Sequence, residues 1–186
     1  TLGLDSRPAK RFSALQLDRP RQCIITWGAD VTIGDNGLPS QIRHKRVTTE
    51  GIGGGMLTSP ISLHILRANT RLQMKPGKLR LGNENADSIA WTSATSTLTR
   101  ELDVSTVAHI EADGHMMFNI SILYTGSQKM RVDDVRLEIP LRKAAVPYFM
   151  GLSKPGGYRP SNWSWSWSAD RSSRVGQLRG QNPAMG

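Results

Sequence analysis

The pattern that most constrains this chain lies between residues 101 and 142, where apolar and polar side chains alternate with a period of two. Residues 102–112 are extended in character, and Asp113-Gly114 predicts a two-residue hairpin turn after them. The return strand puts Met117, Asn119 and Ser121 on one face. The opposite face carries Met116, Phe118, Ile120, Ile122 and Tyr124. Such alternation is typical of a strand with one buried and one wet face.

A second alternating segment follows and predicts another strand of the same kind. Its expected core face consists of Val135, Leu137, Ile139 and Leu141. Its expected solvent face consists of Arg136, Glu138 and Arg142. This segment therefore also predicts one side packed on a core and one side in water.

Turn signals divide the rest of the chain into short extended segments. Asp35-Asn36-Gly37 predicts a tight turn with positive φ at both Asn36 and Gly37, and Pro76-Gly77 predicts another turn. No segment sustains a helical period of 3.6 residues. We therefore expect an all-β fold, a mostly antiparallel β-sandwich that a missing or neighbouring chain completes. Residues 1–21 are predicted to be a basic arm or edge strand, and residues 22–186 the sandwich segment with an aromatic C-terminal loop or strand.

The net charge of +9 favours acidic partners such as anionic polysaccharide, nucleic acid or anionic lipid. Basic residues are spread along the chain without a long run, which argues against specific nucleic-acid binding. No apolar stretch is long enough to span a membrane as a helix. Cys23 is the only cysteine, so an internal disulfide is excluded.

The most unusual segment is aromatic and lies near the C-terminus. Trp163, Trp165 and Trp167 alternate with serines, so in a strand all three indoles project to one face. Such a row needs a cover, which is either the protein's own core, a neighbouring domain, a sugar ring or a stacked base. Tyr158 and Arg159 follow a Gly-Gly pair in the preceding loop and are expected to supply a polar rim for a bound sugar.

Several blocks of this sequence resemble large proteins related to glycoside hydrolase family 123. They are Tyr148-Phe149-Met150-Gly151-Leu152, Gly156-Gly157-Tyr158-Arg159-Pro160, the Trp-x-Trp-x-Trp run, Asn36-Gly37-Leu38-Pro39-Ser40-Gln41-Ile42, and Ile110-Glu111-Ala112-Asp113-Gly114-His115-Met116. The resemblance spans about residues 22–186 and implies β-sandwich domains placed ahead of a catalytic (β/α)₈ barrel. This chain shows no βαβα pattern, so it is expected to be a piece of such a protein without the barrel.

We expect no catalytic residue, no cofactor and no metal site in this chain. The acidic candidates Glu101, Asp103, Glu111, Asp113 and Asp133-Asp134 are interpreted as turn formers and solvated charges. The four histidines have no metal-ligand spacing. Asn119 and Asn162 open Asn-x-Ser sequons and are candidate glycosylation sites if the protein is secreted by a eukaryote.

These observations predict a non-catalytic β-sandwich module of an extracellular, carbohydrate-active protein. The module would support a catalytic domain or bind a polysaccharide, and the parent protein is a candidate glycoside hydrolase. One alternative is a structural subunit of an extracellular assembly, whose identical subunits or missing flanking domains join by strand addition. The other is a basic nucleic-acid-binding module.

Overall fold

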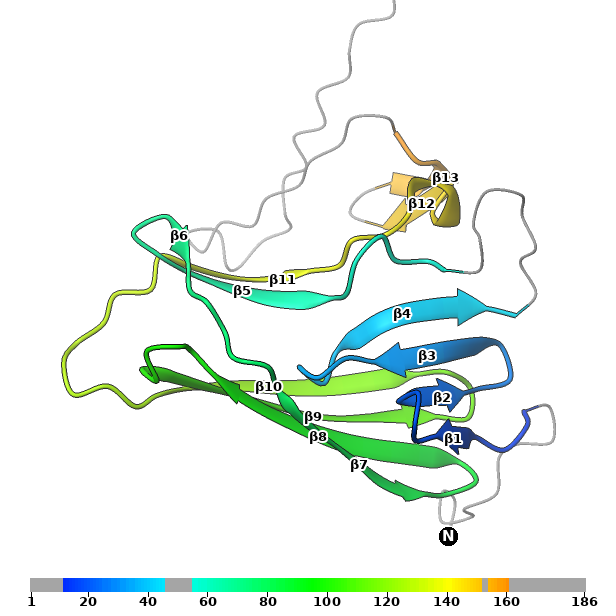
Figure 1. The fold of residues 1–186 in the computed structure, drawn as a ribbon. Coiled ribbons are helices and arrows are strands. Elements are labelled where there is room, and N and C mark those ends of the chain that lie inside the picture. Colours follow the sequence, from blue (N-terminus) through cyan, green and yellow to red (C-terminus); the bar gives the residue numbers. More distant parts are fainter. Residues whose placement is uncertain (1–11, 46–54, 152–153, 161–186) are drawn as a thin grey trace, which may run out of the picture. The chain divides into compact units, whose positions relative to one another are not determined.

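The computed structural model describes residues 12–45, 55–151 and 154–160. Every pairing between the named strands of these ranges is antiparallel, and the one helical element among them is a short 3-10 turn. This confirms the expected all-β, antiparallel fold (Figure 1). The chain divides into two compact units, one ending at Arg142 and one beginning at Lys143.

The larger unit opens with a four-stranded sheet whose strands pair in chain order. Its strands are β1 (Gln16–Asp18), β2 (Cys23–Ile25), β3 (Ala29–Ile33) and β4 (Pro39–His44). β1 lies within the segment for which an arm or edge strand was expected, and it is the edge strand of this sheet. The residue before β1 is hydrogen-bonded to the loop between β7 and β8, because Leu15 donates its backbone N–H to the carbonyl of Ala86 at 3.2 Å.

A second four-stranded sheet forms the opposite layer in the order β10-β9-β8-β7 (Figure 1). Its strands are β7 (Lys78–Glu84), β8 (Ser88–Ser96), β9 (Leu102–Glu111) and β10 (Met116–Tyr124). The long β9–β10 hairpin confirms the pair of strands predicted from the alternation after residue 101. Its loop is longer than the two residues expected, because Glu111 N–H donates to His115 O across residues 112–114. Gly114 takes a φ of +92° there, as three-residue hairpin loops require.

A third sheet, in the order β11-β5-β6, extends the layer of β1–β4. Its strands are β5 (Ser62–Arg67), β6 (Thr70–Arg71) and β11 (Asp134–Glu138). The segment before β5 joins it to β4, because Met56 N–H donates to Ile42 O at 2.8 Å and Ile61 N–H to Pro39 O at 3.0 Å. β11 is thus the far edge of one layer, and β10 is an edge of the other.

Three apolar clusters fill the space between the layers. The largest joins Ile24, Val31 and Ile33 of the first sheet to Ile89, Trp91, Ala108 and Ile110 of the second. A small cluster of Leu38, Leu57 and Ile61 continues it. The third joins Ile65 of β5 to Leu102 and Val104 of β9. The predicted sandwich is therefore confirmed, with side chains of both layers meeting in one interior.

The apolar face of the segment around β11 is not the buried core face that its alternation predicts. Val135 and Leu137 lie beside Ile65 and Leu63 of β5, so they do point to the inner side of the sheet. They are nevertheless 47% and 46% exposed, and Ile139 and Leu141 are 51% and 42% exposed. β11 is an edge strand of its sheet, with a neighbouring strand on one side only, whereas β5 is flanked on both sides.

The turn at Asp35-Asn36-Gly37 forms as expected, but with positive φ at one position only. Gly37 has a φ of +79°, and Asn36 keeps a negative φ. The Asn36 side chain instead accepts the Leu38 N–H at 3.0 Å and donates to the carbonyl of Ile61 at 3.0 Å. The side-chain hydrogen bond that Asn36 accepts from the Leu38 N–H therefore stabilises the turn without a positive φ at Asn36.

The smaller unit begins with a 3-10 turn at Lys143–Ala145 and continues as a two-stranded hairpin. Its strands are β12 (Tyr148–Gly151) and β13 (Lys154–Tyr158). Their register pairs Tyr148 with Tyr158 and Phe149 with Gly157, and it shifts between Phe149 and Gly151.

Candidate functional site

Two tyrosines on the β12–β13 hairpin form the most exposed aromatic pair of the described residues. Tyr148 and Tyr158 are opposite each other in the strand register. Their ring centroids are 5.1 Å apart with planes tilted by 33°. They are 66% and 80% exposed, and Met150 next to them is 81% exposed. An aromatic pair at this distance is attractive in itself, yet it leaves ring faces open to a ligand.

Two glycines explain how the sequence builds this hairpin. Gly156 and Gly157 have φ values of +112° and +151°, which residues other than glycine rarely adopt. Gly156 lies beside Met150, whose Cγ would be 3.9 Å from an added Cβ. The Gly-Gly pair therefore permits the irregular strand that places Tyr158 opposite Tyr148.

Arg159 holds the base of the hairpin. Its backbone N–H donates to the carbonyl of Pro147 at 2.8 Å, and its Nε donates to the carbonyl of Val146 at 3.1 Å. Both contacts fix the chain immediately before Tyr148. Its Nε is thus engaged with the backbone, and the rim role expected for Arg159 stays a prediction.

The other predicted site residues are the three tryptophans and the two sequon asparagines, and none of them lies on the β12–β13 hairpin. Trp163, Trp165, Trp167 and the sequon Asn162 lie outside the described residues. Asn119 is exposed on β10, so its side chain is accessible for a glycan. The sequence reasoning missed Tyr148 as the partner of Tyr158. The available signal was the alternation of Tyr148 and Met150 ahead of a Gly-Gly pair.

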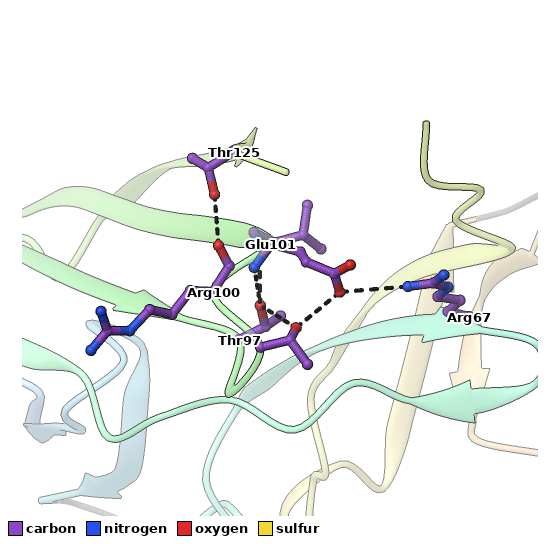
Figure 2. Close-up of polar contacts among 7 residues, drawn as sticks. Arg67, Thr97, Arg100, Glu101 and Thr125 are labelled. Atoms are coloured by element: carbon purple, nitrogen blue, oxygen red, sulfur yellow. Dashed lines mark hydrogen bonds and ion pairs between the residues drawn. The ribbon is translucent and has the colours of Figure 1, made fainter. Parts of the chain in front are cut away.

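Glu101 is engaged in the turn between β8 and β9. Its Oε2 accepts the Thr99 hydroxyl at 2.9 Å and lies 3.5 Å from Nη1 of Arg67. Figure 2 shows the side chains of Glu101 and Arg67 facing each other. The backbone N–H of Glu101 donates to Oγ1 of Thr97 at 3.1 Å, and its carbonyl accepts the Thr125 N–H at 2.9 Å. These contacts are those of a turn former.

Four of the other acidic candidates also have partners, and Asp103 is exposed on β9. Asp113 accepts the His115 N–H at 2.8 Å, and Glu111 lies 3.8 Å from His109. Asp133 lies 3.2 Å from Arg131, and Asp134 pairs with Arg136. Within the described ranges, no group of His, Cys, Asp or Glu side chains is arranged to hold a metal ion. No helix in those ranges is long and apolar enough to cross a membrane.

The fold and this hairpin define a class: a β-sandwich domain followed by a short unit with exposed aromatic rings. A family model described as glycoside hydrolase 123, third domain, matches residues 16–181. The chain therefore belongs to the glycoside hydrolase 123 third-domain family, as the resemblance of its motifs predicted. None of the curated proteins compared with it matches. None of the solved structures compared with it matches either.

Proposed function

We propose that this chain is a non-catalytic module of an extracellular, carbohydrate-active protein and that its β12–β13 hairpin binds a polysaccharide. The observation that carries the proposal is the Tyr148–Tyr158 pair, two contacting tyrosines that are 66% and 80% exposed. The apolar C–H faces of sugar rings stack on aromatic rings, and phenol hydroxyls both donate and accept hydrogen bonds. The family match supports a carbohydrate-active setting.

The charge of the chain directs the choice of polysaccharide. A net charge of +9 attracts a glycan that carries carboxylate or sulfate groups. Arg159 lies next to Tyr158 in the chain, and guanidinium Nη groups bind such anions well. We therefore expect acidic polysaccharide to bind more tightly than neutral polysaccharide, and the difference to shrink as salt screens the charges.

The same proposal gives the tryptophan run a role as an extension of the aromatic platform. Trp163, Trp165 and Trp167 follow the hairpin within a few residues and lie within the segment that the family model matches. Asn119 and Asn162 would carry glycans if the protein is secreted by a eukaryotic cell. Support of a catalytic domain is the role left to the module if it binds no polysaccharide.

The test is a binding titration with chondroitin sulfate as the acidic probe and dextran as the neutral one. Tyr148→Ala and Tyr158→Ala should each weaken binding of chondroitin sulfate about fivefold or more, in line with about 1–3 kcal/mol per stacked ring. Leu98→Ala removes a 60% exposed apolar side chain that lies outside the hairpin and outside β10, and it should leave binding unchanged. A variant with all three of Trp163, Trp165 and Trp167 changed to alanine measures the contribution of that run. Equal binding by Tyr158→Ala and the unchanged chain would reject the hairpin as the site.

A further inference from the structure

β10 is an edge strand that lacks the features by which edge strands usually avoid pairing. It runs for 9 residues from Met116 to Tyr124 without a charged residue or a proline. Its register with β9 is regular along its whole length. Long, regular edge strands without charge, proline or bulge are templates for pairing with another strand.

The hydrogen bonds at the two ends of β10 identify which of its backbone N–H and C=O groups face away from β9. Glu111 N–H donates to His115 O and Thr125 N–H to Glu101 O, both at 2.9 Å. In an antiparallel ladder, residues that exchange bonds with the neighbouring strand alternate with residues that point away from it. The odd-numbered residues 115–125 therefore bond to β9. The even-numbered residues 116–124 present their N–H and C=O groups to the free side.

The side chains of β10 are complementary to themselves in one antiparallel arrangement. With a two-fold axis at Ile120, residue i of one copy lies opposite residue 240 − i of the other. Asn119 then faces Ser121 of the second copy, and Met117 faces Leu123. Polar meets polar and apolar meets apolar, and this axis alone pairs the full strand.

Exposure points to the same surface. Met117 and Leu123 are 54% and 63% exposed, and Val107 on the neighbouring strand is 56% exposed. Ile122 and Tyr124, on the inner face of β10, are 40% and 38% exposed although they lie beside the buried Val104 and Leu102. A partner strand beside β10 would cover Met117, Leu123, Ile122 and Tyr124 while it satisfies the free backbone groups, whereas Val107 lies one strand further in and stays outside the contact.

We propose that β10 is a self-association edge, on which a second copy of this chain pairs antiparallel about a two-fold axis at Ile120. The resulting dimer has a continuous sheet that runs through both copies. Such an interface is isologous, so it closes at two subunits. It is independent of the polysaccharide site proposed above.

Charge variants of exposed residues test the pairing. Met117→Lys with Leu123→Lys places Lys opposite Lys twice in the proposed register. Met117→Lys with Leu123→Glu places Lys opposite Glu twice. Sedimentation velocity of the full chain, produced in a bacterial host so that Asn119 carries no glycan, should show a dimer that the first pair of changes weakens at least tenfold. The second pair should keep the dimer, and so should the matched control Val107→Lys. A chain that stays monomeric at all concentrations would overturn the proposal.

Disulfide trapping tests the register itself. In a Cys23→Ser background, Asn119→Cys and Ser121→Cys are made as separate chains of different tagged mass. The pair 119–121 is a non-hydrogen-bonded pair with Cα atoms about 4.5 Å apart, which suits a disulfide. Mild oxidation of the mixture should give mainly the mixed dimer. Equal amounts of the mixed dimer and the two self-linked dimers would overturn the axis at Ile120.

Discussion

Trp91 donates its indole Nε1–H to the backbone carbonyl of Gly37 at 2.8 Å, across 54 residues of sequence. The indole is 1% exposed, and the turn that carries Gly37 lies against Ser93 and Thr106 of the opposite sheet. Ser93 donates its hydroxyl to Asp35 O, and Thr106 donates to Asn36 O at 3.1 Å. The turn thus supplies the acceptors for three buried donors of one sheet and ties the two layers together.

Removal of this indole hydrogen bond should destabilise the sandwich. Trp91→Phe leaves the Gly37 carbonyl buried without its partner, which costs about 1–3 kcal/mol, and the smaller ring adds a cavity cost. Urea unfolding followed by circular dichroism measures the change. Trp27→Phe is the comparison variant, because Trp27 is 42% exposed and contacts Phe12 edge-on, so the change should cost less than Trp91→Phe. A loss for Trp91→Phe no larger than that for Trp27→Phe would show that the bond contributes little.

Alanine substitutions at Gly37 and Gly114 should distinguish the cost of backbone strain from the cost of steric overlap. Gly37 and Gly114 have similar φ values of +79° and +92°. A Cβ at Gly37 would lie 2.9 Å from the Cβ of Ser93, whereas one at Gly114 would have nothing within 4 Å. Gly114→Ala should therefore cost about 1–2 kcal/mol from strain alone. Gly37→Ala should cost more, because the turn must also move away from the core. Equal unfolding free energies for the two variants would contradict this.

Thr97 is expected to be essential for the turn between β8 and β9. It is 1% exposed, and its Oγ1 accepts the N–H groups of Glu101 and Leu102, each at 3.1 Å. Thr97→Val keeps the shape and removes the acceptor, so stability should fall by about 1–3 kcal/mol. Thr97→Ser keeps the acceptor and loses a methyl group, at a cost of about 1 kcal/mol. Chemical denaturation of both variants checks the order, and the reverse order would assign the role to the methyl group.

The contrast between β10 and β11 shows how far the sequence predicts this fold. Alternation correctly assigns the inner face of both strands, and with the turn signal at Asp113-Gly114 it predicts the β9–β10 hairpin, although with a shorter loop than the structure has. It cannot tell whether anything covers that face, because cover depends on the order of strands in the sheets. Ile65 is 2% exposed, whereas its neighbour Val135 is 47% exposed at the edge.

The candidate site was predictable in part for a similar reason. Tyr158 is recognisable from its place after a Gly-Gly pair, and Tyr148 is an ordinary strand residue until the hairpin register is known. The register includes a shift between Phe149 and Gly151, which residue types alone do not specify. Pairing across such an irregularity depends on tertiary structure as much as on local sequence.

Cys23 should make the stability of the sandwich fall at alkaline pH. Burial raises the pKa of its thiol above the ordinary value of 9.0, a hydrogen bond with Thr32 partly offsets this, and the charges of Asp30 and Asp18 raise it further. Between 9.0 and the higher folded pKa, the unfolded chain has lost the proton that the folded chain keeps, so unfolding becomes more favourable as pH rises. Cys23→Ser removes this contribution. The loss of unfolding free energy between about pH 7 and about pH 10 should therefore be smaller in Cys23→Ser than in the unchanged chain, with all other titrations common to both. Identical losses would show that the thiol ionises equally in the folded and unfolded chain.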